Sequence, residues 1–126
     1  MKILIAEDDV VTLKVLEARL KRAGHQVESS IDGIEALKKI EVYQPDLVIT
    51  DILMPYSSGL EFAGEVKQNY NIPIIILSGL HQESVIVEAF SLGIDDYITK
   101  PFSALELVSR VNRLCNKVES IYFSSL

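Results

Sequence analysis

Charged and hydroxyl side chains follow several of the short apolar runs in this 126-residue chain, at the points where strands would end. Asp8 and Asp9 come soon after the first run, and Asp51 follows the third. Ser78 and Lys100 follow the fourth and the fifth. A charged group at the end of an apolar strand is costly to bury unless it is paired or bound. We therefore expect these side chains to face an opening rather than the core.

Strand-like and helix-like segments alternate along the chain. The segments predicted to be strands are residues 3–6, 26–30, 47–50, 73–77 and 96–99. The segments with helical spacing of apolar residues are 11–23, 32–42, 58–70, 82–92 and a last one that starts near 103. Five such units with short connections predict one α/β domain, a doubly wound parallel sheet of five strands with helices on both faces. The second strand is polar enough to lie at a sheet edge.

Residues that favour helix ends occur at the expected boundaries. Capping-box patterns begin at Asp32, Ser58 and Ser103, where the second, third and fifth helices are expected to start. Gly24 and Gly93 follow the first and fourth helices, where a left-handed C-terminal cap favours glycine. These residues support the division of the chain into five strand–helix units.

Composition limits the class of protein. A formal net charge of −6 argues against nucleic-acid binding by this domain, because duplex binding depends on Lys and Arg that neutralise phosphates. The one cysteine, Cys115, excludes an intramolecular disulfide and a zinc site made of cysteines. The apolar runs are too short for a signal peptide or a membrane-spanning helix. We expect a cytoplasmic protein that binds neither nucleic acid nor membrane directly.

Three carboxylates that meet at one edge of a sheet repel one another, so protons or a cation must offset them. Asp8, Asp9 and Asp51 offer only oxygen ligands, which suit a hard divalent ion such as Mg2+. Beside them, Lys100 can pair with phosphoryl oxygens, and Ser78 can donate a hydrogen bond. Each residue also has a simpler explanation, since acids are common at solvated helix N-termini and strand-end residues often cap turns. Their joint placement, rather than any one of them, indicates a site.

The chain resembles the receiver domain of the two-component response-regulator family, over about residues 2–118. The matching elements are Glu7-Asp8-Asp9, Asp51 with Met54-Pro55, Ser78-Gly79, Tyr97 and Lys100-Pro101-Phe102. The resemblance implies a flavodoxin-like receiver fold with the strand order 2-1-3-4-5. We expect a receiver domain at residues 1–118 and, at residues 119–126, a C-terminal tail or the start of a linker.

The resemblance assigns roles to the strand-end residues. It implies that Asp51 is the phosphoacceptor, which takes a phosphoryl group from a sensor histidine kinase or a phosphotransfer protein. Asp8, Asp9 and Asp51, with the backbone carbonyl of Leu53, are implied to hold Mg2+. Lys100 is implied to pair with the phosphoryl group. A chain of this kind catalyses only its own phosphorylation and dephosphorylation, so we expect a signalling protein rather than an enzyme.

The resemblance also implies a switch. Ser78 is expected to hydrogen-bond to the phosphoryl group, and Tyr97 to turn inward when Ser78 moves. The surface formed by the fourth helix, the fifth strand and the fifth helix then changes and signals to an output domain or effector. The same surface can serve a homodimer.

Two alternative functions fit parts of the pattern. An aspartyl-phosphate hydrolase on a similar fold would also use Asp51, but such enzymes usually carry a second acid two residues later, where this chain has Leu53. A receiver that binds partners without being phosphorylated would not need the acids, the hydroxyl and the lysine together. Phosphoacceptance therefore accounts for more of the residues than either alternative.

Overall fold

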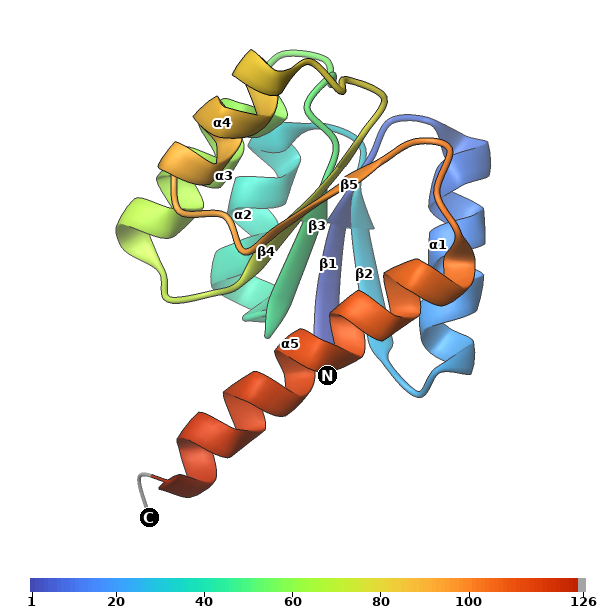
Figure 1. Cartoon of the computed structure of the whole chain (residues 1–126), viewed down its shortest axis with the longest axis vertical. Coiled ribbons are helices and arrows are strands. Elements are labelled where there is room, and N and C mark those ends of the chain that lie inside the picture. Colours follow the sequence, from blue (N-terminus) through green and yellow to red (C-terminus); the bar gives the residue numbers. More distant parts are fainter. Residues whose placement is uncertain (125–126) are drawn as a thin grey trace.

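Five parallel strands form the centre of the molecule, in a computed structural model that describes residues 1–124, with side chains described up to residue 116 (Figure 1). The strands are β1 Lys2–Ala6, β2 Gln26–Ser30, β3 Leu47–Thr50, β4 Ile74–Ser78 and β5 Asp96–Thr99. Their order in the sheet is β2-β1-β3-β4-β5. The predicted fold and strand order are confirmed, including the position of the polar strand β2 at an edge.

Helices cover both faces of this sheet. They are α1 Val10–Arg22, α2 Gly33–Tyr43, α3 Gly59–Asn69, α4 Glu83–Ser91 and α5 Ala104–Ser124. Helices α1 and α5 pack on one face, and α2, α3 and α4 pack on the other (Figure 1). The backbone of α5 continues past residue 118, and residues 125–126 of the expected tail lie outside the described residues. The boundary between domain and tail stays a prediction.

The alternation of side chains along the strands divides the core into two clusters. In β1, Ile3 and Ile5 belong to the cluster under α1 and α5, whereas Leu4 and Ala6 belong to the cluster under α2, α3 and α4. Strands β1, β3 and β4 are covered on both faces. This double cover explains why their sequences are nearly continuous apolar runs.

The predicted capping residues are confirmed at three helix starts. In each case a side-chain oxygen accepts a hydrogen bond from the backbone N–H three residues later, with donor–acceptor distances of 2.8 Å at Asp32, 3.2 Å at Ser58 and 3.3 Å at Ser103. Gly24, after α1, has φ of +96°, as its predicted left-handed cap requires. The strand ends therefore lead into the helices through short, well-defined turns.

Gly59, the first residue of α3, lies directly against the backbone of Asp51. The N–H of Gly59 donates to the carbonyl oxygen of Ile52 at 2.8 Å. A Cβ atom added at Gly59 would lie 1.7 Å from the carbonyl oxygen of Asp51, which no side chain tolerates. The start of α3 therefore fixes the loop that carries Asp51.

Candidate phosphoacceptor site

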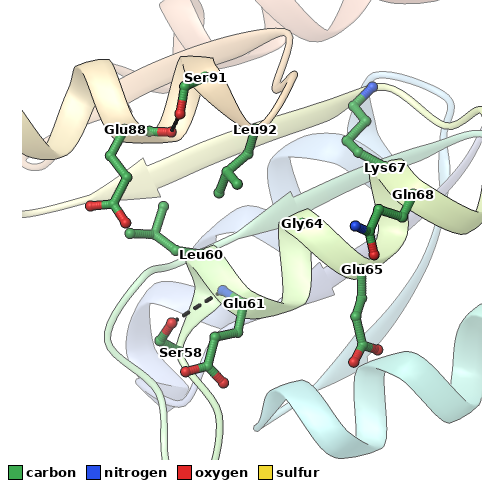
Figure 2. A pocket seen from close by; sticks show the side chains of 10 residues that line it. All are labelled: Ser58, Leu60, Glu61, Gly64, Glu65, Lys67, Gln68, Glu88, Ser91 and Leu92. Carbon is green, nitrogen blue, oxygen red and sulfur yellow. Dashed lines mark hydrogen bonds between the residues drawn. The ribbon is translucent and has the colours of Figure 1, made fainter.

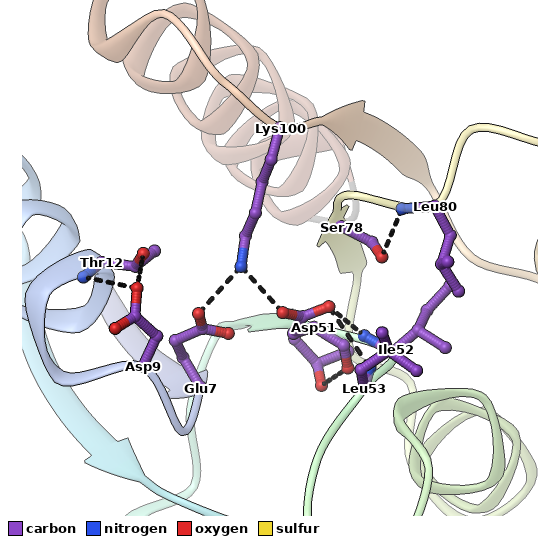
Figure 3. A network of polar contacts seen from close by, with 10 residues as sticks. Glu7, Asp9, Thr12, Asp51, Ile52, Leu53, Ser78, Leu80 and Lys100 are labelled. Carbon is purple, nitrogen blue, oxygen red and sulfur yellow. Dashed lines mark hydrogen bonds and ion pairs between the residues drawn. The ribbon is translucent and has the colours of Figure 1, made fainter.

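The carboxyl ends of the strands bring the predicted site residues to one edge of the sheet. Strand register places Ala6 beside Thr50 in one pair and Ser78 beside Thr99 in another. The residues that follow these positions emerge together, and Figure 3 shows Asp51, Ser78 and Lys100 around one opening. The geometry agrees with the expected convergence of these three side chains.

Lys100 bridges two carboxylates that come from neighbouring strands. Its Nζ lies 2.8 Å from Oδ2 of Asp51 and 2.8 Å from Oε1 of Glu7 (Figure 3). Asp51 is 8% exposed and Glu7 is 2% exposed, so both carboxylates are largely removed from water. One cation therefore serves two buried acids.

The second carboxylate oxygen of Asp51 is held by the backbone that follows it. The N–H of Ile52 donates to Oδ1 at 2.6 Å, and the N–H of Leu53 lies 3.4 Å from the same oxygen. With Oδ2 bound to Lys100, both oxygens have fixed partners. The loop thus orients the carboxylate of Asp51 before any ligand arrives.

The shortage of positive charge appears in the pKa values of the cluster. Burial raises the pKa of Glu7 to about 7, and the Asp51 carboxylate adds to this increase while Lys100 opposes it. Burial alone would lower the pKa of Lys100, but its hydrogen bonds to Asp51 and Glu7 outweigh that effect and raise it. At neutral pH Lys100 is therefore charged, and Glu7 holds a proton more readily than an exposed glutamate does.

Three carboxylates form a compact group that opens to solvent. Glu7, Asp8 and Asp51 each offer one oxygen, and these oxygens lie within 4.8 Å of one another. Glu7 and Asp51 are buried, whereas Asp8 is exposed. Carboxylate oxygens are the ligands that hard divalent cations prefer, and Lys100 cannot neutralise three acids. The donor set therefore fits Mg2+.

The structure differs from the sequence expectation at Asp9. Its carboxylate caps α1, where Oδ2 accepts from the hydroxyl of Thr12 at 2.5 Å and from the N–H of Thr12 at 3.4 Å (Figure 3). The hydrogen bond from the Thr12 hydroxyl holds the pKa of Asp9 below its usual value. Glu7 stands in the acidic group in place of Asp9. Glu7 belongs to the motif Glu7-Asp8-Asp9, but the sequence pattern assigns it no role.

The two residues expected to form the switch are linked through Leu80. Ser78 is fully buried, and its Oγ accepts a hydrogen bond from the N–H of Leu80 at 3.1 Å (Figure 3). Tyr97 is 8% exposed, and its hydroxyl donates to the carbonyl oxygen of Leu80. The Tyr97 ring is therefore already turned inward, and its hydroxyl contacts the same loop after β4 that contacts Ser78.

Two surface hollows differ in their relation to this site. The larger, of about 760 Å3, lies between α3 and α4 over Gly64 and Leu92 and holds none of the strand-end residues (Figure 2). The smaller, of about 490 Å3, is lined by Asp8, Leu53 and Tyr56 among others. Only the smaller hollow shares a residue with the acidic group, so it forms the mouth of the site.

The model of the response regulator receiver domain family matches residues 3–112 of the chain. The chain belongs to this family. A probable transcriptional regulator, ycf27 of Guillardia theta, is 37% identical to the receiver domain over 124 residues, which cover 98% of the chain and 49% of that protein. The chain thus spans about half the length of the curated relatives that it matches.

Solved structures of other receiver domains share the fold closely. The receiver domain of a Francisella response regulator is 37% identical, with a TM-score of 0.88 over 93% of this chain and 98% of that one. The BeF3-activated N-terminal receiver domain of RstA from Klebsiella pneumoniae is 27% identical, with a TM-score of 0.86 over 89% and 96% of the two chains. Within the described part of this receiver domain, no helix is both long and apolar enough to cross a membrane.

Proposed function

We propose that this receiver domain is a phosphorylation-dependent switch in which Asp51 accepts a phosphoryl group from a histidine-phosphorylated protein. The observation that carries the proposal is the environment of Asp51. Its carboxylate is buried, both of its oxygens are held, and Lys100 lies 2.8 Å away beside two further acids. A sensor histidine kinase or a phosphotransfer protein is the proposed donor.

In the proposed reaction a carboxylate oxygen of Asp51 forms a bond to phosphorus while the bond from phosphorus to the donor's histidine nitrogen breaks. The nitrogen keeps the electron pair of that bond, and Asp51 becomes an acyl phosphate. Phosphoryl transfer needs in-line positioning and charge neutralisation more than covalent help from the protein. The amides of Ile52 and Leu53 position the nucleophile, and Lys100 can move from the carboxylate to the new phosphoryl oxygens.

We propose that Glu7, Asp8 and Asp51, with the backbone carbonyl of Leu53, hold Mg2+. The ion supplies positive charge that offsets the phosphoryl oxygens. Asp9 is left out of this set because its carboxylate caps α1. Glu7 must lose its proton to act as a ligand, which its pKa of about 7 permits near neutral pH.

Phosphorylation is proposed to act on the far surface through Ser78 and Tyr97. Ser78 and Lys100 gain the phosphoryl group as a partner only in the phosphorylated state, so they favour one of two arrangements. The backbone of Leu80 contacts both Ser78 and Tyr97, which connects the site to β5. The surface of α4, β5 and α5 is proposed to contact an output domain, an effector or a second copy of the chain.

The test is incubation with acetyl phosphate and Mg2+, followed by intact-mass measurement of wild type and of Asp51→Asn. We expect the wild type to gain one phosphoryl group and the variant to gain none, because an amide is a poor nucleophile. A wild type that is not modified, or a variant that is modified equally, would contradict the proposal. Release of phosphate from an added phosphate monoester, with no phosphoryl group retained on the protein, would instead indicate a hydrolase.

A further inference from the structure

Tyr56 occupies a strained three-residue turn in the loop between β3 and α3. The N–H of Ser57 donates to the carbonyl oxygen of Pro55 at 2.8 Å, and Tyr56 between them has φ of +70°. A turn of this kind with positive φ is rare and strained, and a bulky side chain makes it more so. Glycine would adopt the same backbone without steric conflict.

The fold makes little use of the Tyr56 side chain. The residue is 86% exposed, and no hydrogen bond of its hydroxyl is found among the described residues. Strained residues persist where a function compensates for the strain, and they cluster at active sites and ligand-contacting loops. An exposed aromatic ring on a strained turn therefore points to contact with something outside the chain.

The position of Tyr56 indicates what that contact is. Tyr56, Leu53 and Asp8 line the same hollow at the mouth of the Asp51 site, and Leu53 is also largely exposed, at 63%. A donor protein has to bring a histidine side chain to Asp51 through this mouth. Since a stable protein interface covers about 800 Å2 on each partner, its footprint extends well beyond the opening and over the neighbouring loop.

We propose that Tyr56 is a docking residue for the histidine-phosphorylated donor and that its ring packs against apolar groups on the donor around the phosphohistidine. The inference rests on the proposed function of Asp51. Tyrosine is well suited to this part, because it buries a large rigid surface at a small cost in side-chain entropy and is enriched among residues that dominate binding. A small donor such as acetyl phosphate reaches Asp51 without this contact.

The experiment compares a protein donor with a small one. Purified, autophosphorylated cytoplasmic cores of a panel of histidine kinases are mixed with the wild-type chain, and the core with the fastest transfer serves as the probe. The variants are Tyr56→Gly, which removes the ring and the strain, and Tyr56→Phe, which keeps the ring. Val42→Ser is the matched control, because Val42 is also an apolar residue with a highly exposed side chain, at 88%. Helix α2 starts at the site edge of the sheet, and Val42 lies near its other end, away from the site.

We expect Tyr56→Gly to lower kcat/KM for transfer from the kinase core by about tenfold, mainly through KM, as for an interface anchor. The kcat/KM values of Tyr56→Phe and Val42→Ser for the same transfer should stay within about twofold of the wild-type value. Labelling by acetyl phosphate should be equal in all four proteins. The Tm of Tyr56→Gly should equal or exceed that of wild type because the strained turn relaxes, so misfolding does not confound the result.

Several results would overturn the inference. Unchanged transfer to Tyr56→Gly would remove the docking role, and an equal fall in acetyl phosphate labelling would place the effect in the site itself. Loss of a dimer of the chain with unchanged transfer would assign the ring to a self-interface. A wild type that acetyl phosphate labels, but that no core in the panel phosphorylates, would exclude a histidine-phosphorylated donor. Failure of wild-type labelling by both donors would instead refute the proposed function of Asp51.

Discussion

Two buried aspartates, Asp51 and Asp96, stand in opposite electrostatic surroundings. They are almost equally buried, at 8% and 9% exposure. Asp51 shares the cation Lys100 with a second acid, Glu7. Asp96 has two guanidinium partners, and its two carboxylate oxygens lie 2.7 Å and 3.2 Å from nitrogens of Arg110 and Arg113. The first cluster is short of positive charge, and the second is not.

This difference distinguishes a site from a structural ion pair. At Asp96 the carboxylate also accepts from the N–H of Tyr97 at 2.9 Å, so its hydrogen-bonding capacity is well used. At Asp51 the acids outnumber the cation, and burial raises the pKa of Glu7 to about 7. A buried group of excess acids is costly unless a cation or proton joins it. We therefore expect changes at Asp51 to alter ligand binding and changes at Asp96 to alter folding stability alone.

The largest effect is expected for Lys100→Met, which removes the cation shared by two acids. At pH 8 the free energy of unfolding should fall by about 3 kcal/mol, because two buried carboxylates remain unpaired. At pH 5 the loss should be smaller, since Glu7 then takes up a proton. Urea denaturation at both pH values measures the difference, with the exposed Lys14→Met as control. Equal losses at the two pH values would contradict the shortage of positive charge.

Asp96→Asn should affect folding but not phosphorylation. The substitution leaves Arg110 and Arg113 near each other without their shared carboxylate, and we expect the free energy of unfolding to fall by about 2 kcal/mol. Labelling of Asp51 by acetyl phosphate should match that of wild type at a temperature where both proteins are folded. Asp51→Asn should instead abolish labelling by acetyl phosphate and leave the free energy of unfolding close to that of wild type. A strong loss of labelling in Asp96→Asn would show that the two clusters are coupled.

Glu7→Gln should stabilise the protein in a pH-dependent manner. The folded pKa of about 7 lies above the ordinary glutamate value of 4.5, so the folded protein binds the proton more tightly than the unfolded chain does. The contribution of Glu7 to stability is therefore greatest below pH 4.5 and is lost as the pH rises through 7. We expect the variant to exceed wild type by about 2 kcal/mol at pH 8 and to equal it near pH 4. Urea denaturation of both proteins across this pH range measures the difference in their free energy of unfolding. If Glu7 were solvated, this difference would not change with pH.

The smallest effect is expected for added Mg2+. A ligand at ten times its Kd stabilises the folded state by about 1.4 kcal/mol, and chelation should reverse the gain. Asp8→Asn should lose this stabilisation. Asp9→Asn should keep it, because asparagine caps a helix nearly as well as aspartate and the carboxylate of Asp9 already serves α1. If Asp9→Asn lost the Mg2+ effect and Asp8→Asn kept it, our proposed ligand set would be wrong.

Most of the fold could be predicted because its signals are local. The buried strands are continuous apolar runs, and Asp32, Ser58 and Ser103 carry their capping oxygens within one helical turn of the amides they accept from. Asp51, Ser78 and Lys100 could be placed together because parallel strands end at a common edge. Each of these inferences depends on residues that are close in sequence or on the register of strands.

The remaining features depend on distant contacts or on exact backbone angles. Three consecutive acids precede α1, and their order alone does not show which of them turn inward. Thr12, three residues after Asp9, was the available signal that Asp9 caps the helix. The pairing of Asp96 with Arg110 joins residues 14 positions apart, one on β5 and one on α5, and left no pattern in the sequence. The positive φ of Tyr56 was equally hidden, since tyrosine rarely adopts it.

The contact between Gly59 and the backbone of Asp51 also limits how this protein can vary. In a library that randomises the acceptor loop, we expect position 59 to return only glycine, since any Cβ would collide with the carbonyl oxygen of Asp51. The exposed side chain of Leu53 faces no such steric limit, so diversity can accumulate there. An engineer who transfers the acceptor loop to another scaffold must therefore move the first turn of α3 with it, as a single cassette.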